Sequence, residues 1–335
     1  MKIAFLFIIY DLIEKEDLWY NFFKDININK FSIYIHGKDN TLIKFKNDFF
    51  KNYIIKENYP TEWACYSLVH LQNRLLELAI TDVNNTKFIL LSGTHIPLHK
   101  FDFIYNFLIK NDNSYISFEH YRSQSADLIN RFTTINNYKN YNLNNWNYAS
   151  QWSILNRNIS KFILDNENEF SMIFSKSIYP DEYAYINYLI ENKKLNNIIN
   201  KRTTYTSLVQ SVDCQKYRAI PHTFDNNEIN VRLINNIKSS YLFMRKIVNT
   251  CNINEDWIFN NNIINFTLFD RKIKLNKESF PKLTLQEYNN LQIKNKSKFN
   301  TNKIKLNKVI QQKYNNIQIK NKPIFNTKNK KIVMR

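Results

Sequence analysis

The chain has 335 residues, of which 44% are hydrophobic and 23% are charged, and its formal net charge is +18. A chain of this length and hydrophobicity can bury a large core, so disorder along its whole length is excluded. Gly37 and Gly93 are its only glycines, which excludes the glycine-rich phosphate loops of P-loop nucleotide hydrolases and of Rossmann dehydrogenases.

The body of the chain alternates predicted strands with predicted helices. In chain order they are strand 2–9, helix 11–23, strand 31–36, helix 63–81 and strand 87–91. A turn then leads to another helix after Pro97. This alternation is typical of an α/β sheet with helices on both faces, and ligands gather at the carboxyl ends of its strands, here near His36 and Ser92.

The second half of the body is less regular. Residues 119–145 have weak periodicity and many asparagines, as expected of a long surface excursion that binds or covers a ligand. A strand is predicted to resume at 146–155, and a strand-like unit at 240–247 ends the organised body.

Most of the positive charge lies in the tail. Residues 284–335 hold 13 basic residues and one acid, which leaves 34 basic and 28 acidic residues for the folded domain, 1–283. The segment YNNLQIKNKSKFNTNK, beginning at Tyr288, returns as YNNIQIKNKPIFNTKNK beginning at Tyr314, a period of 26 residues. Two copies are too few for a solenoid. We predict a flexible, solvated tail, with contact to an anionic surface, nucleic acid or membrane, as the alternative.

The cysteines and the apolar runs indicate which disulfides, metal sites and membrane segments to expect. Its three cysteines lie far apart and no histidine pair has zinc-finger spacing, so we expect neither a disulfide framework nor a structural zinc site. The early apolar run at 3–10 is too short to span a bilayer and lacks a signal-peptidase site. The sequence therefore predicts a soluble or peripherally membrane-associated cytoplasmic protein, with no signal peptide or transmembrane anchor.

The sharpest local motif is Tyr179-Pro180-Asp181-Glu182-Tyr183, in which a proline opens a predicted helix and two acids occupy its first turn. Acids at a helix start interact favourably with the free N–H groups and need no further role. A carboxylate fixed on a rigid helix start can also take a proton from a hydroxyl. The motif by itself leaves both interpretations open.

The sequence contains no Asp-x-Asp pair, with which many nucleotide-sugar transferases hold a divalent metal on a diphosphate. A bound diphosphate would therefore need cationic side chains as its countercharge. Arg218, before Pro221, and Lys246, at the end of SYLFMRK, are the candidates. Solvated surface cations are the alternative.

Eight segments between residues 2 and 247 carry a family resemblance. In order, they are KIAFLFIIYDL with LWYNFF, FSIYIHGKD, WACYSLVHLQNRLLELAI, FILLSGTHIPLHKFDFIYNFL, WNYASQWSILNRNISKFI, YPDEYAYINYL, VDCQKYRAIPHTF and SYLFMRKI. Together they resemble the core-2/I-branching β-1,6-N-acetylglucosaminyltransferase family (glycosyltransferase family 14), and especially its plant-type branch.

The resemblance implies a GT-A-like, Rossmann-like glycosyltransferase fold with a mixed central sheet flanked by helices. It implies an inverting enzyme that moves a sugar, N-acetylglucosamine, from a UDP donor to a carbohydrate hydroxyl, with no divalent metal or other cofactor. The family's catalytic base falls on Glu182, and its diphosphate-neutralising Arg and Lys fall on Arg218 and Lys246. One base suffices for one in-line displacement, so a single carboxylate fits this chemistry.

The resemblance also implies a pocket for the donor nucleotide and sugar. Its predicted residues are His36, Ser92, Gly93, Ser150, Trp152 and Asp181. The sequence departs from the family pattern next to two of these residues, His36 and Ser150. Gly37 and Lys38 separate the strand-end histidine from the acid that often follows it, and Ala149 replaces the glycine of the family's G-S-(Q/A) turn.

Aromatic and basic residues extend these expectations. Trp146 and Trp152 are candidates for stacking on sugar rings, with core packing as the alternative. By their position in the excursion, Arg122, Arg131 and Lys139 are candidates for acceptor contacts.

Three functional readings remain open on the sequence. A UDP-sugar transferase acting on a glycan or glycoconjugate is the main one, with xylose, glucose and glucuronic acid as further candidates for the donated sugar. The alternative is a catalytically degenerate carbohydrate- or polyanion-binding protein on the same fold. Nucleic-acid binding through the basic tail ranks third.

Overall fold

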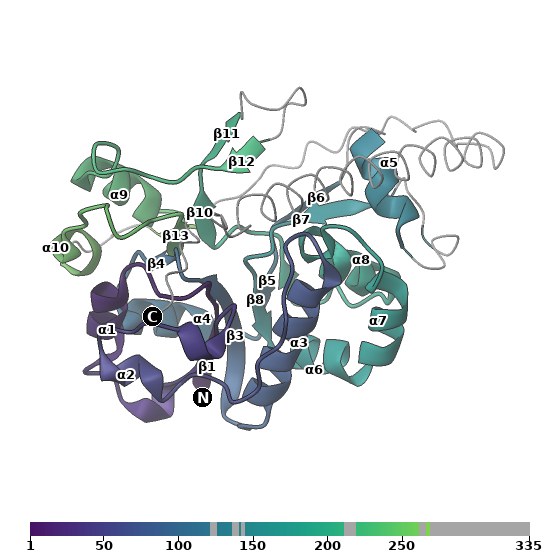
Figure 1. Cartoon of the computed structure of the whole chain (residues 1–335), viewed down its shortest axis with the longest axis horizontal. Coiled ribbons are helices and arrows are strands. Elements are labelled where there is room, and N and C mark those ends of the chain that lie inside the picture. Colours follow the sequence, from purple (N-terminus) through teal and green to yellow (C-terminus); the bar gives the residue numbers. More distant parts are fainter. Residues whose placement is uncertain (121–125, 136–140, 142–144, 211–218, 261–265, 269–335) are drawn as a thin grey trace, which may run out of the picture. The chain divides into compact units, whose positions relative to one another are not determined.

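A six-stranded sheet with the strand order β2-β1-β3-β8-β5-β9 lies at the centre of the computed structural model (Figure 1). Its strands are β1 (Lys2–Ile8), β2 (Phe31–His36), β3 (Asn85–Ser92), β5 (Ser114–Tyr115), β8 (Ile154–Asn156) and β9 (Ile198–Ile199). β1 runs parallel to β2 and β3, whereas β8 runs antiparallel to both β3 and β5. The mixed α/β sheet is therefore confirmed. The structure describes residues 1–120, 126–135, 141, 145–210, 219–260 and 266–268.

Smaller sheets within the described ranges have the orders β10-β13-β4, β11-β12 and β6-β7. Their strands are β4 (Ile96–Pro97), β6 (Phe118–His120), β7 (Asn147–Ala149), β10 (Thr204–Thr206), β11 (Leu208–Gln210), β12 (Ala219–Pro221) and β13 (Phe243–Arg245). β13 pairs antiparallel with β4, which follows closely on β3. This pairing brings the chain near residue 245 to the end of β3.

Helices cover both faces of the central sheet (Figure 1). They are α1 (Glu16–Phe23), α2 (Asp48–Lys51), α3 (Tyr66–Ile80), α4 (Phe101–Ile109), α5 (Ala126–Thr133), α6 (Arg157–Asp165), α7 (Glu167–Phe174), α8 (Ala184–Glu191), α9 (Val231–Lys238) and α10 (Glu255–Phe259). Short 3₁₀ turns are η1 (Ile28–Lys30), η2 (Asn40–Leu42) and η5 (Pro180–Glu182). Within the described part of the chain, every helix is too short or too polar to cross a bilayer.

The core explains why the first strand reads as a continuous apolar run. Phe5 and Phe7 pack against the aromatic side chains of α1, with ring centroids 5.0 Å apart for Phe5 and Phe23 and 5.1 Å apart for Phe7 and Trp19. Because side chains alternate along a strand, Leu6 lies on the opposite face, where α3 packs on β1 and β3. A strand buried on both faces needs apolar residues at every position.

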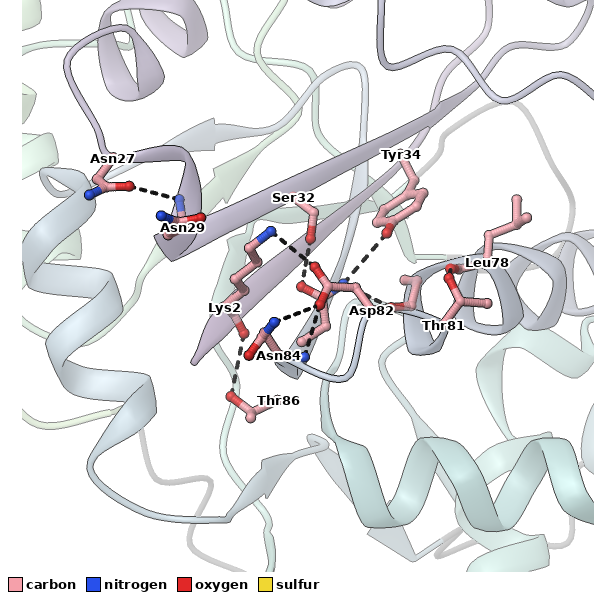
Figure 2. Close-up of polar contacts among 12 residues, drawn as sticks. Lys2, Asn27, Asn29, Ser32, Tyr34, Leu78, Thr81, Asp82, Asn84 and Thr86 are labelled. Atoms are coloured by element: carbon pink, nitrogen blue, oxygen red, sulfur yellow. Dashed lines mark hydrogen bonds and ion pairs between the residues drawn. The ribbon is translucent and has the colours of Figure 1, made fainter.

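A network of polar contacts fastens the amino ends of the strands (Figure 2). The Lys2 ammonium lies 3.0 Å from the Asp82 carboxylate, in the loop that leads into β3. The Ser32 hydroxyl donates to the Asn85 side chain at 2.5 Å, and the Thr86 hydroxyl donates to the Lys2 carbonyl at 3.4 Å. These contacts join β1, β2 and β3 at the end opposite to His36 and Ser92.

Arg157, the first residue of α6, strengthens the same end. Its guanidinium donates to the backbone carbonyls of Ile80, Asp82 and Asn85 at 2.8 to 3.1 Å. The cation thus caps the carboxyl end of α3, where it also interacts favourably with the helix dipole.

Two predicted elements differ in the structure. Residues 146–155 contribute to two short strands, β7 and β8, which belong to different sheets. Between these strands, the Ser150 N–H donates to the Ser117 carbonyl, and the Ser153 carbonyl accepts from the Leu90 N–H. The predicted helix at Pro180 is instead the 3₁₀ turn η5, and α8 begins only at Ala184. The prediction of one long strand and of one helix opened by the proline was therefore wrong in both places.

Candidate functional site

The carboxyl ends of β1, β2 and β3 finish level with one another. In the parallel register, Ile8 pairs with His36 on one side and with Ser92 on the other. The register confirms the prediction that His36 and Ser92 share this edge of the sheet.

His36 is a buried part of this edge, with 1% of its surface exposed. Its Nε2 accepts a hydrogen bond from the Tyr59 backbone N–H at 2.8 Å. Burial lowers the pKa of His36 to about 4, so the imidazole is neutral at pH 7. Its Nδ1 is also buried and has no partner among the described residues. Its contact with a donor nucleotide stays a prediction.

At the turn after β3, Ser92 is held by hydrogen bonds to His95, and Gly93 packs closely against the backbone of Leu12. The Ser92 hydroxyl lies 2.8 Å from Nδ1 of His95, and the Ser92 backbone N–H donates to the same nitrogen at 2.9 Å. His95 is fully buried, which holds its pKa well below the ordinary value. A Cβ at Gly93 would lie 2.4 Å from the Leu12 carbonyl, so the close approach of the chain requires glycine here.

Trp152 lies between His95 and a cation that the sequence analysis did not single out. Its ring meets His95 edge-on, with centroids 4.5 Å apart, and the Arg245 guanidinium lies 4.2 Å from its ring centroid. Burial lowers the pKa of Arg245 to about 10, which leaves it cationic at neutral pH. Its Nε is buried without a hydrogen-bond partner among the described residues, and no described carboxylate pairs with Arg245. The only sequence signal for Arg245 is its place beside Lys246.

Lys246 is anchored through its backbone. Its N–H donates to the His222 carbonyl at 3.4 Å, its carbonyl accepts from the Phe224 N–H at 3.1 Å, and the next residue, Ile247, donates to the Thr94 carbonyl at 3.0 Å. Burial, and then the neighbouring Arg245, lower the pKa of Lys246. The two adjacent cations therefore lie beside the turn that follows β3.

The other predicted residues lie in the second half of the folded part or outside the described chain. The Ser150 N–H donates to the Ser117 carbonyl at 2.8 Å, and the Ser150 hydroxyl accepts from the Trp152 N–H at 3.3 Å. Trp146 is 1% exposed and packs on Phe132, so the core interpretation holds for this tryptophan. Arg218, Arg122, Lys139 and the tail 284–335 lie outside the described residues.

The turn η5 holds the two acids in an unusual backbone. Tyr179, just before it, has φ 56°, and its N–H donates to the carbonyl of Ala64, which has φ 65°. Left-handed backbone is unfavourable for residues other than glycine and concentrates at functional sites. The N-cap of α8 is Tyr183, and no side chain caps that helix. The acids therefore make no capping hydrogen bond to α8.

Glu182 instead forms an ion pair with Arg131 of α5. The guanidinium donates to Oε2 at 2.5 Å, and the two side chains are 12% and 31% exposed for Arg131 and Glu182. The guanidinium also lies 4.5 Å from the ring centroid of Tyr179. Oε1 of Glu182 has no hydrogen-bond partner among the described residues. Within the described part of the chain, one oxygen of the carboxylate is held and the other has no donor.

Asp181 is the more buried of the two acids. Burial, and then the negative charge of Glu182, raise its pKa to about 7. Its Oδ1 is buried without a hydrogen-bond partner among the described residues. Such an unsatisfied group is uncommon in folded proteins.

One short segment runs from a contact with α8, the helix that follows the two acids, to Trp152 beside Arg245. The Asn147 backbone N–H donates to the side-chain oxygen of Asn187 in α8 at 2.9 Å, about one turn beyond η5. Five residues later the same segment reaches Trp152 beside Arg245. An extended chain of that length spans roughly 18 Å at most, which bounds the distance between Asn147 and Trp152.

Comparisons with known proteins agree with the sequence resemblance. The family model of the Core-2/I-Branching enzymes matches residues 3–238. The chain is 25% identical over 170 residues to the glycosyltransferase BC10 of Oryza sativa subsp. japonica, which covers 50% of this chain and 41% of that protein. The chain thus spans less than half the length of this curated relative.

Proposed function

The chain belongs to the core-2/I-branching enzyme family of glycosyltransferases, and from that premise we propose that it transfers N-acetylglucosamine from a UDP donor to a carbohydrate hydroxyl with inversion, without a divalent metal. The observation that carries this proposal is the state of Glu182. Its carboxylate is partly exposed and is fixed through one oxygen by Arg131, and the other oxygen has no donor among the described residues.

The proposed reaction is one displacement. The acceptor hydroxyl oxygen attacks the anomeric carbon as the bond from that carbon to the diphosphate oxygen breaks. The UDP leaves with the bonding electron pair, and the hydroxyl proton passes to Glu182. A base within hydrogen-bond reach of the hydroxyl is all that this side of the reaction needs.

Cationic side chains would stabilise the charge that develops on the leaving diphosphate. Lys246 and Arg218 take this role in the proposal, and the position of Arg245 next to Lys246 supports a third contribution. Donor contacts are proposed for His36, Ser92, Gly93, Ser150, Trp152 and Asp181. The proposed acceptor is a glycan or glycoconjugate, and an anionic surface is the proposed contact of the basic tail.

The test compares the wild type with Glu182→Gln in EDTA, over a panel of UDP-sugars. We expect one UDP-sugar to raise the melting temperature of both proteins, to be hydrolysed slowly by the wild type, and to be hydrolysed only at a small residual rate by the variant. The amide keeps the shape of the side chain but takes up no proton. Absence of a thermal shift with every UDP compound, with or without metal, would refute the transferase proposal and favour the degenerate binding protein.

A further inference from the structure

Arg131 contacts the proposed base, but the reaction described above gives this arginine no role of its own. It comes from α5, inside the excursion 119–145, and reaches a residue 51 positions later in the chain. Its side chain is 12% exposed, so most of the guanidinium is out of water. A buried guanidinium needs a paired acceptor, and Glu182 provides it.

The contacts around this ion pair form a closed loop. Arg131 donates to the Glu182 carboxylate, the Glu182 N–H donates to the Tyr179 carbonyl at 3.1 Å, and the Tyr179 ring lies against the Arg131 guanidinium. A further link joins the end of α5 to the same turn, since the Ile178 N–H donates to the Thr134 hydroxyl at 3.3 Å. Both the backbone and the side chain of Glu182 are thus held by neighbours that touch each other.

The geometry favours a role in orientation over a role in stability alone. A carboxylate that rotates freely offers either oxygen in many directions, whereas one whose Oε2 is fixed presents Oε1 in a defined direction. A misplacement of about 1 Å in a reacting group can lower a rate by roughly 10²-fold. The charge also counts, because Asp181 brings a second carboxyl group next to Glu182 and the charge of Arg131 opposes the repulsion between them.

We propose that Arg131 is the positioning residue of the base: it fixes Oε2 of Glu182 so that Oε1 receives the proton. The inference rests on the proposed function, because it assigns a partner to the base of that reaction. It also makes the excursion part of the reaction machinery, since α5 delivers the guanidinium.

The experiment uses hydrolysis of UDP-N-acetylglucosamine with water as the acceptor. Without a carbohydrate acceptor, an effect on turnover does not arise from lost acceptor contacts. The variants are Arg131→Gln, Arg131→Lys, Glu182→Gln and the double variant Arg131→Gln/Glu182→Gln, each measured for kcat, donor KM and melting temperature. The expected loss for Arg131→Gln is about 10- to 100-fold in kcat, with the donor KM within about threefold of wild type.

Two further results are expected. Arg131→Lys recovers part of the lost kcat, since an ammonium can still hold one oxygen but lacks the planar fork. In the double variant, loss of Arg131 adds less than about twofold to the effect of Glu182→Gln, because residues that act as a unit are not additive.

Arg74 provides the matched control. It is also a partly buried arginine, 18% exposed, and it pairs with Glu167 on another element. Arg74→Gln is expected to lower the melting temperature and leave kcat within about twofold of wild type. An unchanged kcat in Arg131→Gln, or full additivity with Glu182→Gln, would overturn the positioning role while the proposed function stands. If the wild type turns over no UDP-sugar, both the positioning role and the proposed function are refuted.

Discussion

The buried carboxyl group of Asp181 should make the stability of the protein depend on pH in a way that one substitution removes. In the folded state, burial and the charge of Glu182 raise the pKa of Asp181 from 3.8 to about 7. The folded protein therefore keeps a proton that the unfolded chain has already released above pH 4. Stability is lost as the pH rises from about 4 to 7, and the full penalty is present above pH 7.

The magnitude follows from the two pKa values. A pKa difference of one corresponds to about 1.4 kcal/mol, so the penalty from Asp181 is roughly 1.7 kcal/mol at pH 5 and roughly 4.3 kcal/mol at pH 8. Asp181→Asn keeps the shape and removes the titration. We expect the free energy of unfolding of this variant to rise relative to wild type by roughly 2 to 3 kcal/mol between pH 5 and pH 8.

Urea denaturation of both proteins at the two pH values measures this difference. Asp165→Asn, which removes an exposed carboxylate on α6, controls for the loss of a negative charge. An Asp181→Asn difference from wild type that is the same at pH 5 and pH 8 would show that burial does not hold the proton on Asp181.

Three further predictions concern the backbone and the cations. Ala64→Gly should raise the free energy of unfolding by about 1 kcal/mol, because the residue has φ 65°, and an unchanged melting temperature would contradict this. Gly93→Ala should lower the free energy of unfolding by roughly 1 to 3 kcal/mol, because the new Cβ would lie 2.4 Å from the Leu12 carbonyl. Thermal unfolding followed by circular dichroism tests this prediction. Lys246→Gln should weaken UDP binding about 10- to 100-fold in calorimetry, as expected for a lost charged hydrogen bond, and wild-type affinity would exclude Lys246 from the diphosphate site.

The parallel half of the sheet could be predicted from the sequence because its strands are buried on both faces. Strands at 2–9 and 31–36 and the helix at 63–81 correspond to β1, β2 and α3, with ends shifted by up to three residues. The start of α3 moves to Tyr66 because Ala64 adopts a left-handed backbone. Two-residue strands such as β5 and β9 are too short to show any period, so their places in the sheet could not be predicted.

The candidate site was predictable where a local motif carries the chemistry. Glu182 stands out because two acids follow a proline, and Lys246 because it ends an apolar strand. The partners of these residues depend on contacts between distant segments. Neither the pairing of Arg131 with Glu182 nor the packing of Arg245 on Trp152 leaves a spacing in the sequence that could have indicated it.

The fastening of the strands at their amino ends has a consequence for how this protein can evolve. Lys2 pairs with Asp82 (Figure 2). Arg157 donates to the carbonyl of Asn85 at the start of β3, at the opposite end of that strand from Ser92. A mutation at the edge that carries Ser92 removes none of these hydrogen bonds. Descendants of this chain can therefore exchange the side chains around a ligand while the connection from α3 to β3 keeps its strength.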